Sequence, residues 1–96
     1  MTMRPDIVLD DFARHLGKSF DIVAGDILFP LTLYTATPVF PSARAGGSFS
    51  LVFVGPRSPI LKQGTYPVRC DGEEWPLFIV PVGERDAVFE YEVIFN

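Results

Sequence analysis

The sequence is poor in the residues that most often build catalytic and metal sites. Its 96 residues include one histidine, His15, and one cysteine, Cys70. One cysteine cannot form a disulfide within the chain, and one histidine with one cysteine cannot make a structural zinc site of the usual kind. No Gly-x-Ser-x-Gly, Walker or dinucleotide-binding pattern occurs. We therefore expect no catalytic residues, no metal, no cofactor and no enzymatic activity.

Positive charge and long apolar runs are also scarce. Eight Lys and Arg residues stand against twelve Asp and Glu, which gives a net charge of -4 at pH 7. This negative net charge repels the phosphate backbone of nucleic acids, so we expect no nucleic-acid partner. Every apolar run is far shorter than the roughly twenty residues of a spanning helix, and no secretory leader is evident. These absences predict a cytoplasmic protein that has no membrane partner.

Apolar residues, by contrast, are abundant. They make up 48% of the chain and include nine phenylalanines. This content is enough for a core that needs neither disulfides nor metal, and the length suits one domain. We expect a single domain over residues 1–96, with residues 1–6 loosely held.

Alternation of apolar and polar residues is clearest in the segment 47–66. Phe49, Leu51 and Phe53 fall on one face of an extended chain, because successive side chains point to opposite sides. Val52 and Val54 predict that the strand becomes covered on both faces before Gly55-Pro56 ends it. The same pattern, with turn residues between the runs, predicts further strands at 20–23, 31–37, 66–70, 75–82 and 89–95.

Proline and glycine refine these strands. Pro30, Pro38 and Pro67 favour edge or bulge positions, since proline cannot donate to a ladder. Asp71-Gly72 is typical of a two-residue hairpin turn. The nearly continuous apolar run at 75–82 predicts a buried strand, and the chain is expected to turn at 83–87.

One short helix is expected before the first strand. Leu9, Phe12 and Leu16 recur at helical spacing, and Gly17 follows where a left-handed cap is common. His15 would lie in the last turn, where a positive charge favours the helix dipole. The whole pattern predicts a mainly β fold, a compact antiparallel six-stranded barrel or sandwich with one short N-terminal helix.

The few groups that could carry chemistry have structural interpretations. Cys70 could pair with His15, but it alternates with Tyr66 and Val68 as a small core residue would. The acidic residues at 71–74 lack the spacing of a calcium loop and suit a solvated turn.

The loop at 56–64 is the candidate partner-binding surface. Its mixture of apolar and polar groups suits a protein contact, to which we assign Arg57, Ile60, Leu61 and Gln63. The alternative is that Ile60 and Leu61 fold back as a plug over one end of the barrel. Trp75 is a further candidate anchor, although a tryptophan half buried in its own domain is the commoner case.

Five pieces of the chain, in order, are similar to segments of a family of small all-β bacterial proteins of unknown function: LGKSF (16–20), FSLVFVGP (49–56), LKQGTYPV (61–68), LFIVPVG (77–83) and YEVIFN (91–96). The resemblance spans nearly the whole chain. Members of that family are encoded near phage-tail-collar or tail-fibre-like proteins. The resemblance therefore implies an accessory role in a phage-derived, tail-like assembly, and it implies no catalytic residues.

Three functional hypotheses follow. The first is a non-enzymatic interaction or assembly protein that contacts a protein partner, or a second copy of itself, through a sheet edge or the 56–64 loop. The second is a small-ligand or glycan-binding module, which requires Tyr34, Tyr66 and Trp75 to cluster on an accessible surface. The third is an enzyme with dispersed carboxylates, which requires a polar cleft.

Overall fold

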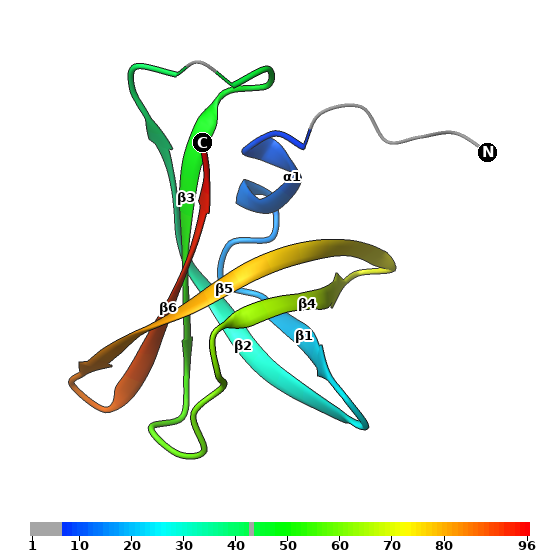
Figure 1. The fold of residues 1–96 in the computed structure, drawn as a ribbon, viewed down its shortest axis with the longest axis vertical. Coiled ribbons are helices and arrows are strands. Elements are labelled where there is room, and N and C mark those ends of the chain that lie inside the picture. Colours follow the sequence, from blue (N-terminus) through cyan, green and yellow to red (C-terminus); the bar gives the residue numbers. More distant parts are fainter. Residues whose placement is uncertain (1–6, 43) are drawn as a thin grey trace.

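Six antiparallel strands and one short helix make up the part of the chain that the computed structural model describes, residues 7–42 and 44–96 (Figure 1). The strands close into a barrel in the order β1-β2-β3-β6-β5-β4. The predicted mainly β, six-stranded antiparallel fold is confirmed, and the structure is a barrel. The expected looseness of residues 1–6 lies outside the described residues. The elements are α1 (Asp10–Ala13), β1 (Ser19–Ala24), β2 (Ile27–Val39), β3 (Ser48–Gly55), β4 (Gly64–Cys70), β5 (Glu73–Arg85) and β6 (Val88–Phe95).

The barrel interior is filled by the inward side chains of all six strands. Phe49, Leu51 and Phe53 of β3 are buried, as their alternation predicts. Val52 and Val54 are only half-buried, so the expectation that β3 is covered on both faces is wrong. Gly55 ends the strand where a Cβ atom would lie 2.5 Å from Leu31 Cδ2, so a larger residue there would have to displace the buried Leu31 side chain.

Strand β2 is longer than its prolines suggest. Pro30 and Pro38 both lie inside it, and each has a register partner on a neighbouring strand. A register shift between Leu33 and Thr35 changes which side chains face inward, so Ala36 packs against the core where alternation predicts Thr35. The bulge is a feature that residue periodicity alone does not reveal.

Strand β5 is also longer than expected, and it is buried on one face only. Trp75, Leu77 and Ile79 are buried, whereas Phe78 is 51% exposed and Val82 is 60% exposed. The strand continues to Arg85, so the turn occupies two residues and not the predicted five. The prediction of a fully buried strand followed by a turn at 83–87 is therefore wrong. A closed single-layer barrel has only one interior, which leaves the other face of every strand outside.

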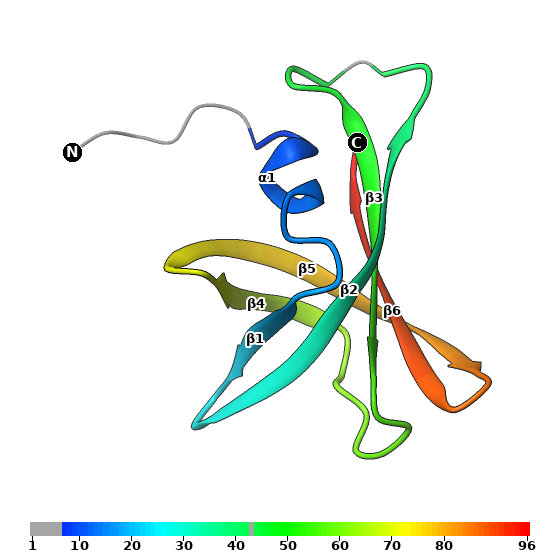
Figure 2. The same cartoon turned by 180° about the vertical axis from the view of Figure 1, so that it is seen from behind.

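The helix α1 covers one end of the barrel (Figure 2). Phe12 is fully buried and packs against the rings of Phe49, Trp75 and Phe95. Leu16 is 53% exposed, so the predicted Leu9-Phe12-Leu16 stripe is wrong at its last member. The helix has already ended at Ala13, and the chain turns toward β1.

The barrel closes along a short seam. Strands β1 and β4 pair at two positions only, Asp21 with Arg69 and Ile22 with Val68. By comparison, β3 and β6 pair at seven. Pro67, which was expected at an edge or bulge, lies in β4 beyond the paired part of the seam. Among the described residues, no helix has the length and apolar character needed to cross a membrane.

Candidate functional site

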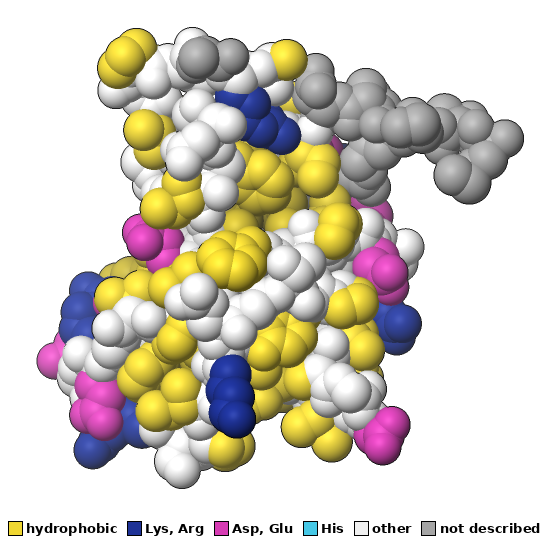
Figure 3. All heavy atoms as spheres, viewed as in Figure 1, with side chains coloured by type: hydrophobic (Ala, Val, Ile, Leu, Met, Phe, Trp, Pro, Cys, Tyr) yellow, Lys and Arg dark blue, Asp and Glu magenta, His cyan; other side chains and the backbone are white. Residues whose placement is uncertain are grey.

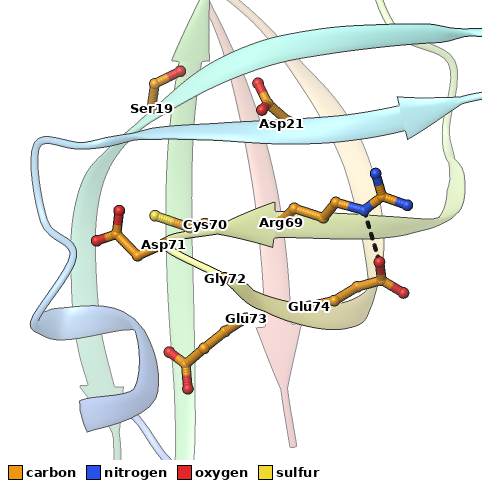
Figure 4. A pocket seen from close by; sticks show the side chains of 8 residues that line it. All are labelled: Ser19, Asp21, Arg69, Cys70, Asp71, Gly72, Glu73 and Glu74. Atoms are coloured by element: carbon orange, nitrogen blue, oxygen red, sulfur yellow. Dashed lines mark hydrogen bonds and ion pairs between the residues drawn. The ribbon is translucent and has the colours of Figure 1, made fainter.

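The turn between β4 and β5 positions the most chemically diverse cluster among the described residues. Asp71 and Gly72 both have positive φ, 50° and 81°, and the flanking Cys70 and Glu73 are register partners. This is the two-residue hairpin that Asp71-Gly72 predicts, because both central positions of such a turn need left-handed backbone. The turn fixes the side chains of Cys70 and Asp71 beside one another (Figure 4).

A polar pocket of about 450 Å3 lies between this hairpin and β1. One of its carboxylates, Glu74, accepts a 2.8 Å hydrogen bond from Arg69 Nε (Figure 4). The enzyme hypothesis requires a polar cleft, so this pocket leaves that hypothesis a prediction that is still to be tested. The pocket lining consists of Ser19, Asp21, Arg69, Cys70, Asp71, Gly72, Glu73 and Glu74.

His15 is 7% exposed and lies beside Asp71 and Glu73, two of the residues that line the pocket. Its Nε2 is 3.3 Å from Glu73 Oε1, within hydrogen-bond distance. Its Nδ1 is 3.3 Å from Asp71 Oδ2, but this buried nitrogen makes no hydrogen bond. The rings of Phe20 and Trp75 contact the imidazole edge-on at 6.0 and 6.2 Å. The expected role of His15 in a final helical turn is wrong, because α1 ends two residues earlier.

Electrostatics and burial shift the pKa values of Asp71 and Cys70 in this cluster. A hydrogen bond of 2.7 Å from Lys18 Nζ, together with the charge of Lys18, lowers the pKa of the Asp71 carboxyl. Burial raises the pKa of the Cys70 thiol, and the nearby Asp71 carboxylate adds to the effect. Asp71 is thus held as a carboxylate and Cys70 as a thiol.

Three side chains in the cluster carry donor atoms that metals accept. The donor atoms of His15, Cys70 and Asp71 all lie within 4.8 Å of one another. Sequence reasoning treated Cys70 as a core residue and residues 71–74 as a solvated turn. Cys70 is indeed buried and Asp71 exposed. A pairing of Cys70 with His15 was considered and the core role favoured, and the approach of Asp71 to both was missed because it joins segments more than fifty residues apart, for which no local spacing is a signal.

The structure divides the residues assigned to partner binding. Arg57, Ile60 and Gln63 are exposed, and Arg57 Nε lies 3.6 Å from Glu84 Oε2. Their role stays a prediction. Leu61 is 5% exposed and its N–H donates a 2.8 Å hydrogen bond to Tyr91 Oη, so at Leu61 the loop is the plug of the alternative interpretation. Trp75 is fully buried in the core. Neither Leu61 nor Trp75 offers surface to a partner.

The aromatic residues proposed for a glycan site do not come together. Tyr34 lies on β2 and Tyr66 on β4, and β1 separates these strands in the barrel. Trp75 points into the core. These three residues therefore form no stacking platform.

The outer face of β5 is the second candidate site. It consists of Pro76, Phe78, Val80 and Val82, and residues 75–83 include no charged side chain. On the neighbouring strand, Pro67 is the register partner of Pro76, and both are exposed. Apolar side chains gather over the region where β5 and β6 cross (Figure 3). We call the four β5 residues the β5 outer face.

Comparison with known proteins supplies a family and no activity. No curated protein matches the chain, and no solved structure matches it either. A family model described as a domain of unknown function, DUF6916, matches residues 7–95. The match takes in the helix and all six strands, and it confirms the expected resemblance to a family of unknown function. The chain belongs to the DUF6916 family.

Proposed function

We propose that the protein is a non-enzymatic interaction protein that docks onto a protein partner through the β5 outer face. The supporting observation is the exposure of one side of a strand whose sequence is apolar on both sides. Strands with one solvated face usually alternate apolar and polar residues, whereas near-continuous apolar runs are typical of strands covered on both faces. Another molecule would supply the second cover for β5.

The composition of this face supports the proposal. Phe78 and Val82 are each more than half exposed, and Pro67, the register partner of Pro76, extends the apolar area onto β4. Clustered exposed apolar groups often mark protein contacts, and aromatic anchors carry much of the binding energy at such contacts. Phe78 is the natural anchor of the surface.

Because the barrel is closed, we expect the partner to pack on the β5 outer face and not to add a strand to the sheet. Strand addition needs a free edge, and closure of the barrel gives each of the six described strands a neighbour on both sides. The loop with Arg57, Ile60 and Gln63 can add contacts, because Arg57 reaches Glu84 near the end of β5.

The proposed partner is a component of a phage-derived, tail-like assembly in the bacterial cytoplasm. The sequence pieces shared with proteins encoded near tail-collar or tail-fibre-like proteins support this choice. A free Cys70 thiol suits a reducing compartment. No nucleic acid or membrane is part of the proposal.

The test compares two substitutions of similarly exposed residues. Phe78→Ser removes the anchor, while Leu28→Ser changes a 55% exposed residue on β2 and serves as control. Tagged protein is isolated from its host, co-purifying proteins are identified, and the complex is rebuilt from purified components. We expect a collar-like or fibre-like protein in fixed ratio with wild type and Leu28→Ser, and affinity at least about tenfold lower with Phe78→Ser.

Two results would count against this function. Equal affinity of Phe78→Ser and wild type for the rebuilt partner removes the β5 outer face from the interaction. A dimer of the purified chain that Phe78→Ser dissociates, with no other partner, would show that a second copy covers the face. Light scattering after size exclusion measures that dimer.

A small-ligand role is the second candidate. A hollow of about 310 Å3 lies beside the β5–β6 turn, where the exposed Tyr34 ring faces the guanidinium of Arg85 at 4.9 Å. Thermal-shift screening of sugars against wild type and Tyr34→Ala tests this role. A stabilisation that Tyr34→Ala abolishes would favour it over docking.

A further inference from the structure

We propose that His15, Cys70 and Asp71 bind a divalent transition-metal ion, with zinc as the physiological candidate. The proposal is independent of the docking function. The site lies at the β4–β5 turn, beneath α1, and its remaining coordination position would open into the polar pocket.

The first argument is the donor set. An imidazole nitrogen, a thiolate sulfur and a carboxylate oxygen are the ligand types that zinc uses, and three protein ligands with one open position are typical of accessible zinc sites. The three donor atoms lie within 4.8 Å of one another. In a tetrahedral zinc site such atoms are about 3.3–3.8 Å apart, so closing around the ion requires shifts of about 1 Å. The exposed Asp71 side chain can supply that shift.

The second argument is the orientation of His15. Glu73 Oε1 lies 3.3 Å from Nε2, which favours the tautomer with its proton on Nε2. A carboxylate that orients a histidine through its other nitrogen is a recurrent feature of metal sites. The Nδ1 lone pair then faces Asp71 Oδ2 at 3.3 Å, buried and without a hydrogen bond. Two lone pairs at that distance repel each other unless a cation lies between them.

The alternative cation is a proton. A doubly protonated His15 between Asp71 and Glu73 would also relieve the repulsion, and it would need no metal. The two possibilities differ in what they predict for Cys70, because an imidazolium does not involve the thiol and a metal ion does. The experiment therefore follows the sulfur.

The third argument is rigidity. The His15 ring packs edge-on against the rings of Phe20 and Trp75, both fully buried. Cys70 is buried at the end of β4, and the two-residue turn fixes the backbone of Asp71. Two of the three ligands are thus held in place by the core, which reduces the entropy lost on binding.

Local charge both attracts the ion and regulates access to it. Asp21 and Glu73 line the adjoining pocket together with Asp71, whereas the charge of Glu74 is compensated by its ion pair with Arg69. Lys18 opposes binding, because its Nζ donates a 2.7 Å hydrogen bond to Asp71 Oδ2. The ammonium has to move aside before this oxygen can bind the metal ion. The Lys18 side chain is about half exposed and free to do so. Removing this ammonium should strengthen metal binding.

Binding changes the protonation of one group. The metal–sulfur bond forms as the S–H bond of Cys70 breaks, and the proton leaves to solvent. Since burial raises the pKa of this thiol, it is protonated at neutral pH before binding. One proton is therefore released for each metal ion bound, and no oxidant or reductant is needed.

Cobalt(II) is the probe, since its thiolate complexes absorb in the near ultraviolet and tetrahedral ones absorb strongly in the visible range. The reduced, full-length chain is titrated with Co2+, then with Zn2+ as competitor, and proton release is followed in weak buffer. We expect one Co2+ per chain, a thiolate charge-transfer band, displacement by Zn2+ and one proton released.

Four variants locate the ligands. Cys70→Ser should abolish the charge-transfer band, and Asp71→Asn should weaken binding at least tenfold while keeping the turn, because asparagine tolerates positive φ. Lys18→Met should tighten binding several-fold. Glu74→Gln, which lines the same pocket without belonging to the donor set, is the matched control and should leave the affinity unchanged.

Three results would overturn the proposal. One is a wild-type chain that shows no thiolate band at micromolar Co2+, which would leave the proton as the cation at His15. Another is a band that survives Asp71→Asn at full affinity, which would indicate adventitious coordination by the thiol. The third is equal weakening by Glu74→Gln and Asp71→Asn. Asp71 is exposed, so its variant should fold even if substitution of His15 disrupts the core.

Discussion

At the scale of single residues, the Tyr91 hydroxyl joins the 56–64 loop to the barrel. Tyr91 is fully buried, and its oxygen accepts a 2.8 Å hydrogen bond from the buried N–H of Leu61. This contact is what makes Leu61 part of the core. It is formed between a strand and a loop thirty residues apart.

Replacing that hydroxyl should destabilise the protein. Tyr91→Phe leaves the Leu61 N–H buried without a partner, and we expect a loss of about 1–3 kcal/mol in the free energy of unfolding, measured by urea denaturation. Tyr66→Phe is the control, because Tyr66 Oη donates to Lys62 O at an exposed position where water can substitute. Equal losses in the two variants would contradict the role assigned to burial.

Tyr91 should also make stability fall at alkaline pH. Burial raises the pKa of Tyr91, and the Leu61 N–H partly offsets the shift. Above about pH 10 the unfolded chain loses the phenolic proton while the folded chain keeps it. The unfolded state then binds fewer protons, so stability decreases as pH rises from the unfolded pKa to the folded one. Urea midpoints between pH 9 and about pH 11 should fall more steeply for wild type than for Tyr91→Phe. Parallel profiles would rule out this contribution.

At the scale of elements, α1 depends on its packing. A helix of four residues cannot persist by itself, because nucleation is unfavourable and few hydrogen bonds form. Phe12 supplies the packing through three aromatic neighbours in the barrel.

Truncating Phe12 should therefore detach the helix from the barrel. We expect Phe12→Ala to lower the free energy of unfolding by about 3–5 kcal/mol, the range for large aromatic residues removed from a core. Leu16→Ala, at a 53% exposed position, should change it by no more than about 0.5 kcal/mol. Chemical denaturation measures both. A large effect of Leu16→Ala would restore the helical stripe that the sequence suggests.

Strand β5 shows how far an apolar run can be interpreted. Residues 75–82 correctly predict a strand, because the run is too short and too rich in proline for a helix. They do not reveal that only one face lies inside the barrel. Whether the second face is covered depends on neighbours that the run itself does not contain.

At the scale of the whole molecule, the barrel has one weak side. Two residue pairs join β1 to β4, and seven join β3 to β6. Local opening in proteins begins where few contacts hold an element.

Hydrogen exchange should reveal this difference. We expect peptides from β1 and β4 to exchange faster than peptides from β3 and β6 under native conditions, measured by mass spectrometry. Uniform protection of the four strands would mean that the barrel opens as one unit. Exchange that is fastest in β3 would contradict the pairing directly.

The local elements follow from short-range patterns in the sequence. Alternation over Phe49, Leu51 and Phe53 specifies which side of β3 is buried, and Asp71-Gly72 specifies a tight turn, because both signals act over two to eight neighbouring residues. These interactions are encoded within the segment that forms them. The six strands and the mainly β class could therefore be predicted.

Which segments meet depends on the packing of the whole chain. Barrel closure through β1 and β4, the bulge beside Tyr34, the burial of Leu61 and Trp75, and the cluster of His15 with the β4–β5 turn all join distant parts of the chain. Contacts of this kind depend on how strands wrap around one core. Local patterns of residue types do not show how the strands wrap, so both candidate sites became visible only in the folded chain.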